Sequence, residues 1–144
     1  MERQGTVSRV AGVVVDAMFS SGNLPSIHDA LVIQRDDGPD LVIEVQEHID
    51  PRTVRGVAMG DTAGLRRGLP VVDTGNPIRV PVGSQTLGRM FNVLGDPIDG
   101  KPAITGEERR AIHRRSPPLS EQQVVTEPFI TGIKAIDLLI PYPR

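Results

Sequence analysis

The sequence contains no cysteine, and only 3% of its 144 residues are aromatic. The absence of cysteine excludes disulfides, thiolate metal ligands and a cysteine nucleophile. Because Phe19, Phe91, Phe129 and Tyr142 are the only aromatic residues, the hydrophobic core must be built from aliphatic side chains. Valine and isoleucine dominate the apolar runs and are typical of strands.

The sequence also lacks a strong net charge and a long hydrophobic run. A net charge of -2 gives no basic field to attract nucleic acid. No apolar run approaches the roughly 18 residues of a membrane-spanning helix, and the first residues, MERQGTVSRV, lack a signal-peptide core. We therefore expect a soluble cytosolic protein with no nucleic-acid partner and no direct membrane insertion.

Residues 1–83 have the pattern of short strands separated by turns. In LVIEVQEHI at 41–49, alternation places Leu41, Ile43, Val45 and Ile49 on one buried face and the polar residues on the other. ALVIQR at 30–35 precedes it, and the turn-forming residues between the two runs predict a hairpin.

Six strands with turn signals every ~8–12 residues predict a small antiparallel β-barrel over 1–83. Gly12 is expected to bulge or bend the first strand, and Thr74–Pro77 to form a tight turn. Pro81 is expected to leave the last strand with a free edge, since proline donates no ladder hydrogen bond. The expected strands are Thr6–Phe19, Ala30–Arg35, Leu41–Ile49, Thr53–Met59, Leu69–Asp73 and Ile78–Val82.

Residues 84–144 have a different pattern, with helical periodicity in two places. Apolar residues at 87, 90, 91 and 94 predict a helix over Ser84–Val93, although Gly88 weakens it. Thr131–Ile140 is predicted to be a second helix, with Thr131 as its cap and an exposed Asp137. These elements are too few to bury a core, so 84–144 is expected to be the beginning of a larger domain.

The segment GDPIDGKP at 95–102 fits the phosphate-loop pattern G-x-x-x-x-G-K-[ST] except at Pro102. A phosphate loop needs backbone N–H groups that point at the anion and a helix that starts after the lysine. Pro97 removes an N–H, Asp96 and Asp99 add negative charge, and Pro102 lacks the magnesium-binding hydroxyl. Two consecutive turns are therefore the favoured interpretation.

No other group of residues predicts a catalytic, cofactor-binding or metal site. Arg109, Arg110, Arg114 and Arg115 form a basic cluster, but glutamates stand beside it and no aromatic residue interleaves to stack bases. This cluster is expected to be a solvated or interface-forming face. His28, His48 and His113 are scattered and follow no metal-ligand spacing.

Several segments together resemble the beta (catalytic) subunit of F-type ATP synthases. They are GTVSRVAGVVVDAMF at 5–19, LVIEVQEHI at 41–49, VRGVAMGDTAGLRRGLPVVDTGNPIRVPVG at 54–83, LGRMFNVLGDPIDGK at 87–101 and TGIKAIDLLIPYPR at 131–144. AIHRRSPP at 111–118 also looks more like beta than like the non-catalytic alpha subunit. The resemblance covers nearly the whole chain in the family's order, although the residues at 36–40 and the stretch SPPLSEQQVVTEPF depart from its commonest wording.

The resemblance implies a barrel over 1–83 and the truncated start of a RecA-like α/β nucleotide-binding domain over 84–144. The whole protein would make or hydrolyse ATP with Mg²⁺, coupled to H⁺ or Na⁺ flow, in a ring of three alpha and three beta subunits around a gamma-containing central stalk. It would lie at the cytoplasmic face of a bacterial inner membrane. The phosphate loop and catalytic glutamate are expected beyond Arg144, so the fragment itself is expected to be soluble, inactive and without cofactor.

Other ring ATPases share this barrel-plus-RecA plan. An alpha subunit, a vacuolar-type subunit, a flagellar export ATPase and a transcription terminator are therefore alternatives. A terminator would need stacking aromatics in its barrel, and residues 1–83 contain only Phe19. A stand-alone barrel used as a binding module is a further alternative, against which the net charge and the lack of aromatics argue.

Overall fold

The computed structural model describes residues 3–20, 24–35, 38–104, 108–121 and 127–143. The chain forms two compact units, Met1–Arg114 and Arg115–Arg144, and each is described by itself. The fold is mainly β, and the described residues include one α-helix, α1 (Lys134–Leu139).

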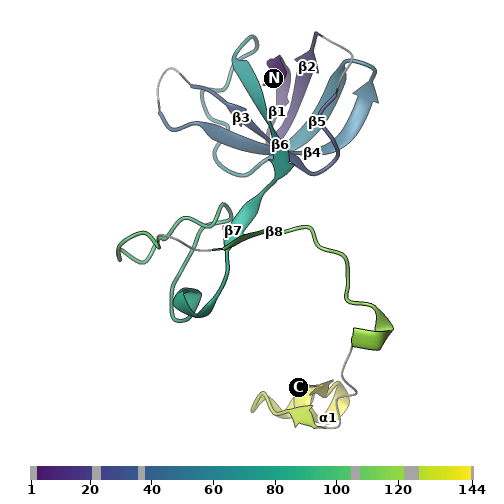
Figure 1. Cartoon of the computed structure of the whole chain (residues 1–144), viewed down its shortest axis with the longest axis vertical. Helices are drawn as coiled ribbons and strands as arrows, with labels where there is room; N and C mark the ends of the chain where they lie inside the picture. Colours follow the sequence, from purple (N-terminus) through teal and green to yellow (C-terminus); the bar gives the residue numbers. More distant parts are fainter. Residues whose placement is uncertain (1–2, 21–23, 36–37, 105–107, 122–126, 144) are drawn as a thin grey trace. The chain divides into compact units, whose positions relative to one another are not determined.

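The first unit contains a closed barrel of six antiparallel strands, as the sequence predicts (Figure 1). The strand order is β1-β2-β5-β4-β3-β6, and β6 pairs back onto β1, with Gly5 opposite Val71, to close the ring. Closure leaves no strand of this sheet without a neighbour on either side. The strands are β1 (Arg3–Ala11), β2 (Val14–Phe19), β3 (Asp29–Ile33), β4 (Leu41–Asp50), β5 (Thr53–Ala58) and β6 (Pro70–Pro77).

The segments that form the barrel strands differ from the prediction, first at the N-terminal strand. The expected single strand Thr6–Phe19 is a hairpin of β1 and β2, with Ala11 paired to Val14 across the turn. Gly12 takes a φ of 61°, which glycine adopts at the first central position of a two-residue hairpin turn. The bend prediction was wrong because valines stand on both sides of Gly12, at positions 10, 13 and 14, so periodicity does not distinguish a bend from a reversal.

The predicted strand Ile78–Val82 lies outside the barrel. It forms β7 (Arg79–Pro81), which pairs with β8 (Arg109–Ala111) in a separate two-stranded sheet. The expected free barrel edge at Pro81 is therefore wrong, because β6 already completes the ring. The expected turn at Thr74–Pro77 is also wrong. These residues are an irregular part of β6, where Asp29 and Leu31 of β3 pair with Pro77 and Asp73.

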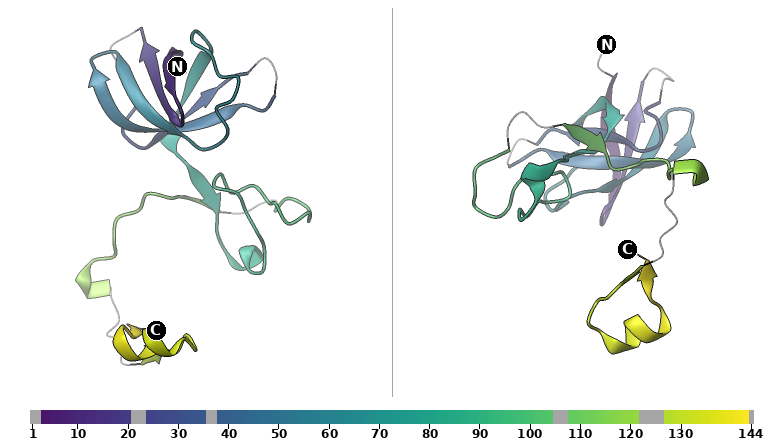
Figure 2. Two further views of the ribbon diagram at one scale, coloured as in Figure 1. Left: turned by 180° about the vertical axis from the view of Figure 1, so that it is seen from behind. Right: turned by 60° about the horizontal axis from the view of Figure 1, so that its bottom comes forward.

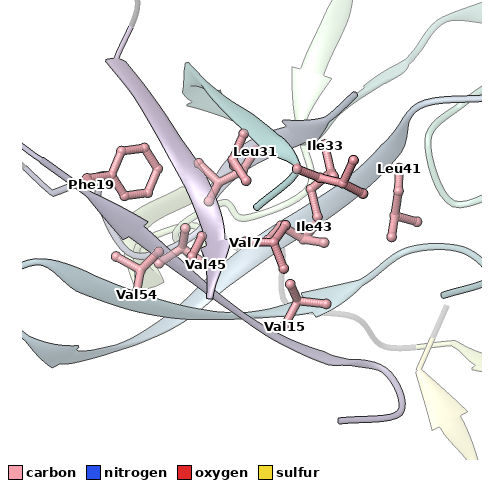
Figure 3. Packing of buried hydrophobic residues seen from close by; sticks show 12 residues of the cluster. Val7, Val15, Phe19, Leu31, Ile33, Leu41, Ile43, Val45 and Val54 are labelled. Atoms are coloured by element: carbon pink, nitrogen blue, oxygen red, sulfur yellow. The ribbon is translucent and has the colours of Figure 1, made fainter. Parts of the chain in front are cut away.

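The barrel interior is an aliphatic core with one aromatic ring, that of Phe19 (Figure 3). Ile43 in β4 is completely buried, whereas Ile49 on the same strand is 43% exposed. Register shifts between Val45 and Glu47 and again between His48 and Asp50 interrupt the alternation, so Ile49 leaves the core face. The prediction that Ile49 shares the buried face with Ile43 is thus wrong.

The segment after the barrel is less regular than predicted. The expected helix over Ser84–Val93 is only a 3-10 turn, η1 (Ser84–Thr86). Gly88 follows with a φ of 70°, a conformation that ends a right-handed helix. Leu87 and Met90, which the periodicity placed on an apolar helix face, are 79% and 61% exposed.

The second unit contains η2 (Leu119–Glu121), β9 (Pro128–Phe129), α1 and β10 (Tyr142–Pro143), with β9 and β10 paired antiparallel (Figure 2). The predicted helix exists but starts at Lys134 rather than Thr131. Thr131 does not cap it as predicted, since the residue at the N-cap is Ile133 and that position has no side-chain cap. No described residue of α1 is buried.

Candidate functional site

Of the two turns predicted in GDPIDGKP, the structure has a bend at Asp99–Lys101 but no turn at Asp96-Pro97. Gly95 and Gly100 adopt φ values of 80° and 70°. Gly95 ends a turn in which its N–H donates to the Asn92 carbonyl at 3.0 Å, and Pro97 forms an isolated bridge with Phe91. The Asn92 N–H donates to the Asp96 carbonyl at 2.9 Å, and the Lys101 N–H donates to the Asp99 carboxylate at 3.2 Å. Residues 101–104 are not helical, so this stretch lacks the helix start that a phosphate loop uses.

Asp99 is held by Arg89 in a two-pronged ion pair. Arg89 Nε donates to Asp99 Oδ2 at 2.6 Å and its Nη2 donates to Oδ1 at 3.1 Å. The same guanidinium donates to the Pro102 carbonyl at 2.9 Å. These hydrogen bonds, foremost those from Arg89, hold the pKa of Asp99 well below its usual range. The pair fixes the second turn and leaves Asp99 as an anion.

The lowered pKa of Asp99 predicts a specific pH response. The pair should contribute stability above the unfolded carboxyl value of about 4, and this should be lost as pH falls through the lower folded value. We expect NMR titration of the Asp99 carboxyl carbon to give a midpoint well below about 4. The substitution Arg89→Ala should raise that midpoint, and equal midpoints in both proteins would contradict the assignment.

The pocket beside this loop does not suit phosphate. Its cation, Arg109, already donates to the carbonyls of Arg79 and Leu94 at 3.0 and 2.9 Å, and Asp96 adds an acidic group. The pocket is lined by Pro81, Phe91, Gly95, Asp96, Pro97, Ala103, Ile104 and Arg109.

The arginine cluster has the solvated character that the sequence predicts. Arg110 Nε pairs with Glu108 Oε1 at 2.9 Å, and both side chains are more than half exposed. Hydrogen bonds from Arg110 lower the pKa of Glu108. Arg114 and Arg115 are exposed as well. An exposed ion pair of this kind adds little to stability. The arginine cluster is therefore described as a charged, solvent-facing surface.

Asp137 is half-buried, not exposed as expected, and it organises the turn before α1. It accepts hydrogen bonds from the Thr131 hydroxyl at 2.6 Å, the Thr131 N–H at 2.9 Å and the Gly132 N–H at 3.0 Å. These bonds, the hydroxyl first, lower the pKa of Asp137. Its role is therefore to hold the entry to the helix.

Two of the three histidines stack beside a buried carboxylate, which their spacing did not indicate. The rings of His28 and His113 are stacked, with centroids 3.9 Å apart. His113 Nε2 lies 2.8 Å from Glu44 Oε1, and Glu44 is 5% exposed although alternation placed it on the polar face. His48 lies apart, with Nε2 2.8 Å from the Pro25 carbonyl. This cluster could not be predicted from the sequence, because His28, Glu44 and His113 lie far apart along the chain.

Residues 7–75 match the family model described as the ATP synthase alpha/beta family, beta-barrel domain. The matched range runs from within β1 to within β6 and so includes at least part of every barrel strand. The barrel is similar to the barrel domain of the ATP synthase alpha/beta family. The coarser part of the sequence-based assignment is thereby confirmed, while the match does not distinguish an alpha from a beta subunit.

The family match is confined to the barrel. Residues 76–144 lie outside the matched range. Among the described residues, no helix is both long enough and apolar enough to cross a bilayer.

Proposed function

We propose that this chain is the N-terminal part of an ATP synthase beta subunit, and that its barrel is a structural element of the alpha/beta ring. The family match over residues 7–75 carries the proposal. The choice of beta over alpha rests on the segments beyond the match, LGRMFNVLGDPIDGK, AIHRRSPP and TGIKAIDLLIPYPR. The whole protein would use Mg²⁺ and ATP or ADP, and it would lie peripherally at the cytoplasmic face of a membrane.

Residues 84–144 are, in this proposal, the start of a RecA-like nucleotide-binding domain. Many large apolar side chains of this region are exposed, and this supports the proposal. The missing sheet and helices of a complete domain would cover such side chains. Leu138, Leu139 and Ile140 of the helical segment are at least 70% exposed. Other exposed apolar residues of the region are Leu87, Met90, Val93, Ile98, Ile112, Leu119, Phe129, Ile130 and Ile133.

Ring assembly is the property that tests the proposal. Co-expressed with an ATP synthase alpha subunit, the chain should co-purify with it, and native mass spectrometry should find both chains in one complex. Isothermal titration of the chain alone with MgATP should show no saturable binding at micromolar concentration. Elution of the chain without alpha would contradict the assembly role, and micromolar MgATP binding would contradict a purely structural fragment.

The same preparation separates the proposal from a stand-alone binding module. Filter binding at low salt should retain no single-stranded RNA or DNA, since the net charge is -2 and the barrel contains one aromatic ring. Retention of nucleic acid together with failure to bind alpha would favour the binding module instead.

A further inference from the structure

The cluster of His28, Glu44 and His113 is the part of the molecule that the proposed function does not use. His28 precedes β3, Glu44 lies in β4 and His113 follows β8. One ligand atom from each residue lies within 4.8 Å of the other two. Because the three residues come from separate segments, the fold alone brings these donors together.

We propose that His28, Glu44 and His113 form a binding site for a divalent transition-metal ion of the zinc type. Two imidazole nitrogens and one carboxylate oxygen are a ligand set that Zn²⁺ uses, with the remaining position open to water. Ligands at about 2.0–2.1 Å from a tetrahedral ion lie about 3.3 Å from one another. The donor atoms lie within 4.8 Å of one another, and the rings of His28 and His113 would turn out of their stack so that both nitrogens point at one ion.

The surroundings of the cluster leave His28 with an unused donor atom. His28 Nδ1 is buried and makes no hydrogen bond, and a buried polar atom without a partner calls for a ligand or another explanation. The backbone at His28 adopts a φ of 74°, an uncommon conformation for a residue other than glycine. Its N–H donates to the Val45 carbonyl at 2.8 Å, which anchors the histidine against β4.

The contacts of the Glu44 carboxylate also suit a metal ligand. Gln46 Nε2 donates to Glu44 Oε2 at 2.6 Å, while Oε1 is the oxygen 2.8 Å from His113 Nε2. An outer hydrogen bond of this kind orients a metal-binding carboxylate. The carboxylate is buried and brings a negative charge that a cation would offset. The bound ion would tie the segment after β8 to the barrel wall.

The test uses Co²⁺ as a spectroscopic probe and Zn²⁺ as its competitor, on the whole chain without a histidine tag. We expect Co²⁺ to give visible absorption bands that saturate at one equivalent and disappear on addition of Zn²⁺. Zn²⁺ should also raise the Tm, since an ion that binds only the folded state stabilises it. No saturable band and no Tm shift with up to about 1 mM metal would overturn the proposal.

Single substitutions identify the ligands. His113→Gln is the principal variant, because the side chain of His113 is 41% exposed and its loss should not unfold the barrel. His28→Asn keeps a residue that tolerates positive φ, and Glu44→Gln keeps the shape of the side chain. Each should weaken Co²⁺ binding at least about tenfold while retaining the wild-type circular dichroism spectrum.

His48→Gln is the matched control, since His48 lies on the same strand as Glu44 but outside the cluster. It should leave the Co²⁺ affinity and the visible spectrum unchanged. Wild-type affinity in His113→Gln, or equal weakening in His48→Gln, would overturn the assignment of these ligands. Neither result would bear on ring assembly, which is measured without added metal.

Discussion

Replacing Ile43 by alanine should lower the free energy of unfolding by about 2–5 kcal/mol, whereas Ile49→Ala should change it by about 1 kcal/mol or less. Both residues lie on β4, and simple alternation assigns both to the core. Ile43 is completely buried and Ile49 is 43% exposed. Truncation at Ile43 therefore leaves a cavity, while truncation at Ile49 removes atoms that already contact water.

Urea denaturation followed by far-ultraviolet circular dichroism measures both variants, with the m-value as a check that the same surface unfolds. The comparison is internal, because residue type, substitution and strand are the same. Equal losses at the two positions would mean that β4 keeps an uninterrupted register. That result would contradict the register shifts in the β4–β5 pairing between Val45 and Glu47 and between His48 and Asp50.

Gly56→Ala should destabilise the barrel by about 1–3 kcal/mol. A Cβ at Gly56 would lie 2.7 Å from the Glu44 carbonyl oxygen and 3.3 Å from Ile43 Cδ1. The carbonyl belongs to the backbone of β4, so it can move aside only by distorting the β4–β5 pairing. Gly56 has an ordinary backbone conformation, so the expected cost comes from steric overlap and not from φ.

Gly60→Ala is the control for the effect of replacing glycine. There the nearest atom to an added Cβ is Leu41 Cδ1 at 3.3 Å, the end of a flexible side chain that can rotate away. We expect the free energy of unfolding to change by less than about 1 kcal/mol. Chemical denaturation of the two variants side by side tests the pair, and a Gly56→Ala protein as stable as Gly60→Ala would contradict the close β4–β5 approach.

The barrel could be predicted from sequence because its strands alternate and its turn residues stand between them. The β3–β4 hairpin is the clearest case, since both strands and their antiparallel pairing are confirmed. What could not be predicted depends on pairing between distant segments. β7 looks like a barrel strand by its own residues, and only the contact of β6 with β1 excludes it from the ring.

The candidate sites also differ in how far they could be predicted from local sequence. In GDPIDGKP, local residue chemistry predicted the bend at Asp99-Gly100, but it misplaced the other turn, which precedes Asp96-Pro97. The pair of Arg89 and Asp99 was missed because a helix was expected over Ser84–Val93. The meeting of His28 with His113 needed the tertiary fold, since no spacing along the chain brings two such distant residues to one carboxylate.

β6 is the neighbour of both β1 and β3 in the ring, and this affects how the protein is made. During synthesis β1 and β3 leave the ribosome early, yet each lacks one partner until β6 follows. Over that interval two strand edges with unpaired backbone groups are open to any other strand. A chain that stops before β6 would keep both edges permanently, so such products are the ones that chaperones or proteases would have to remove.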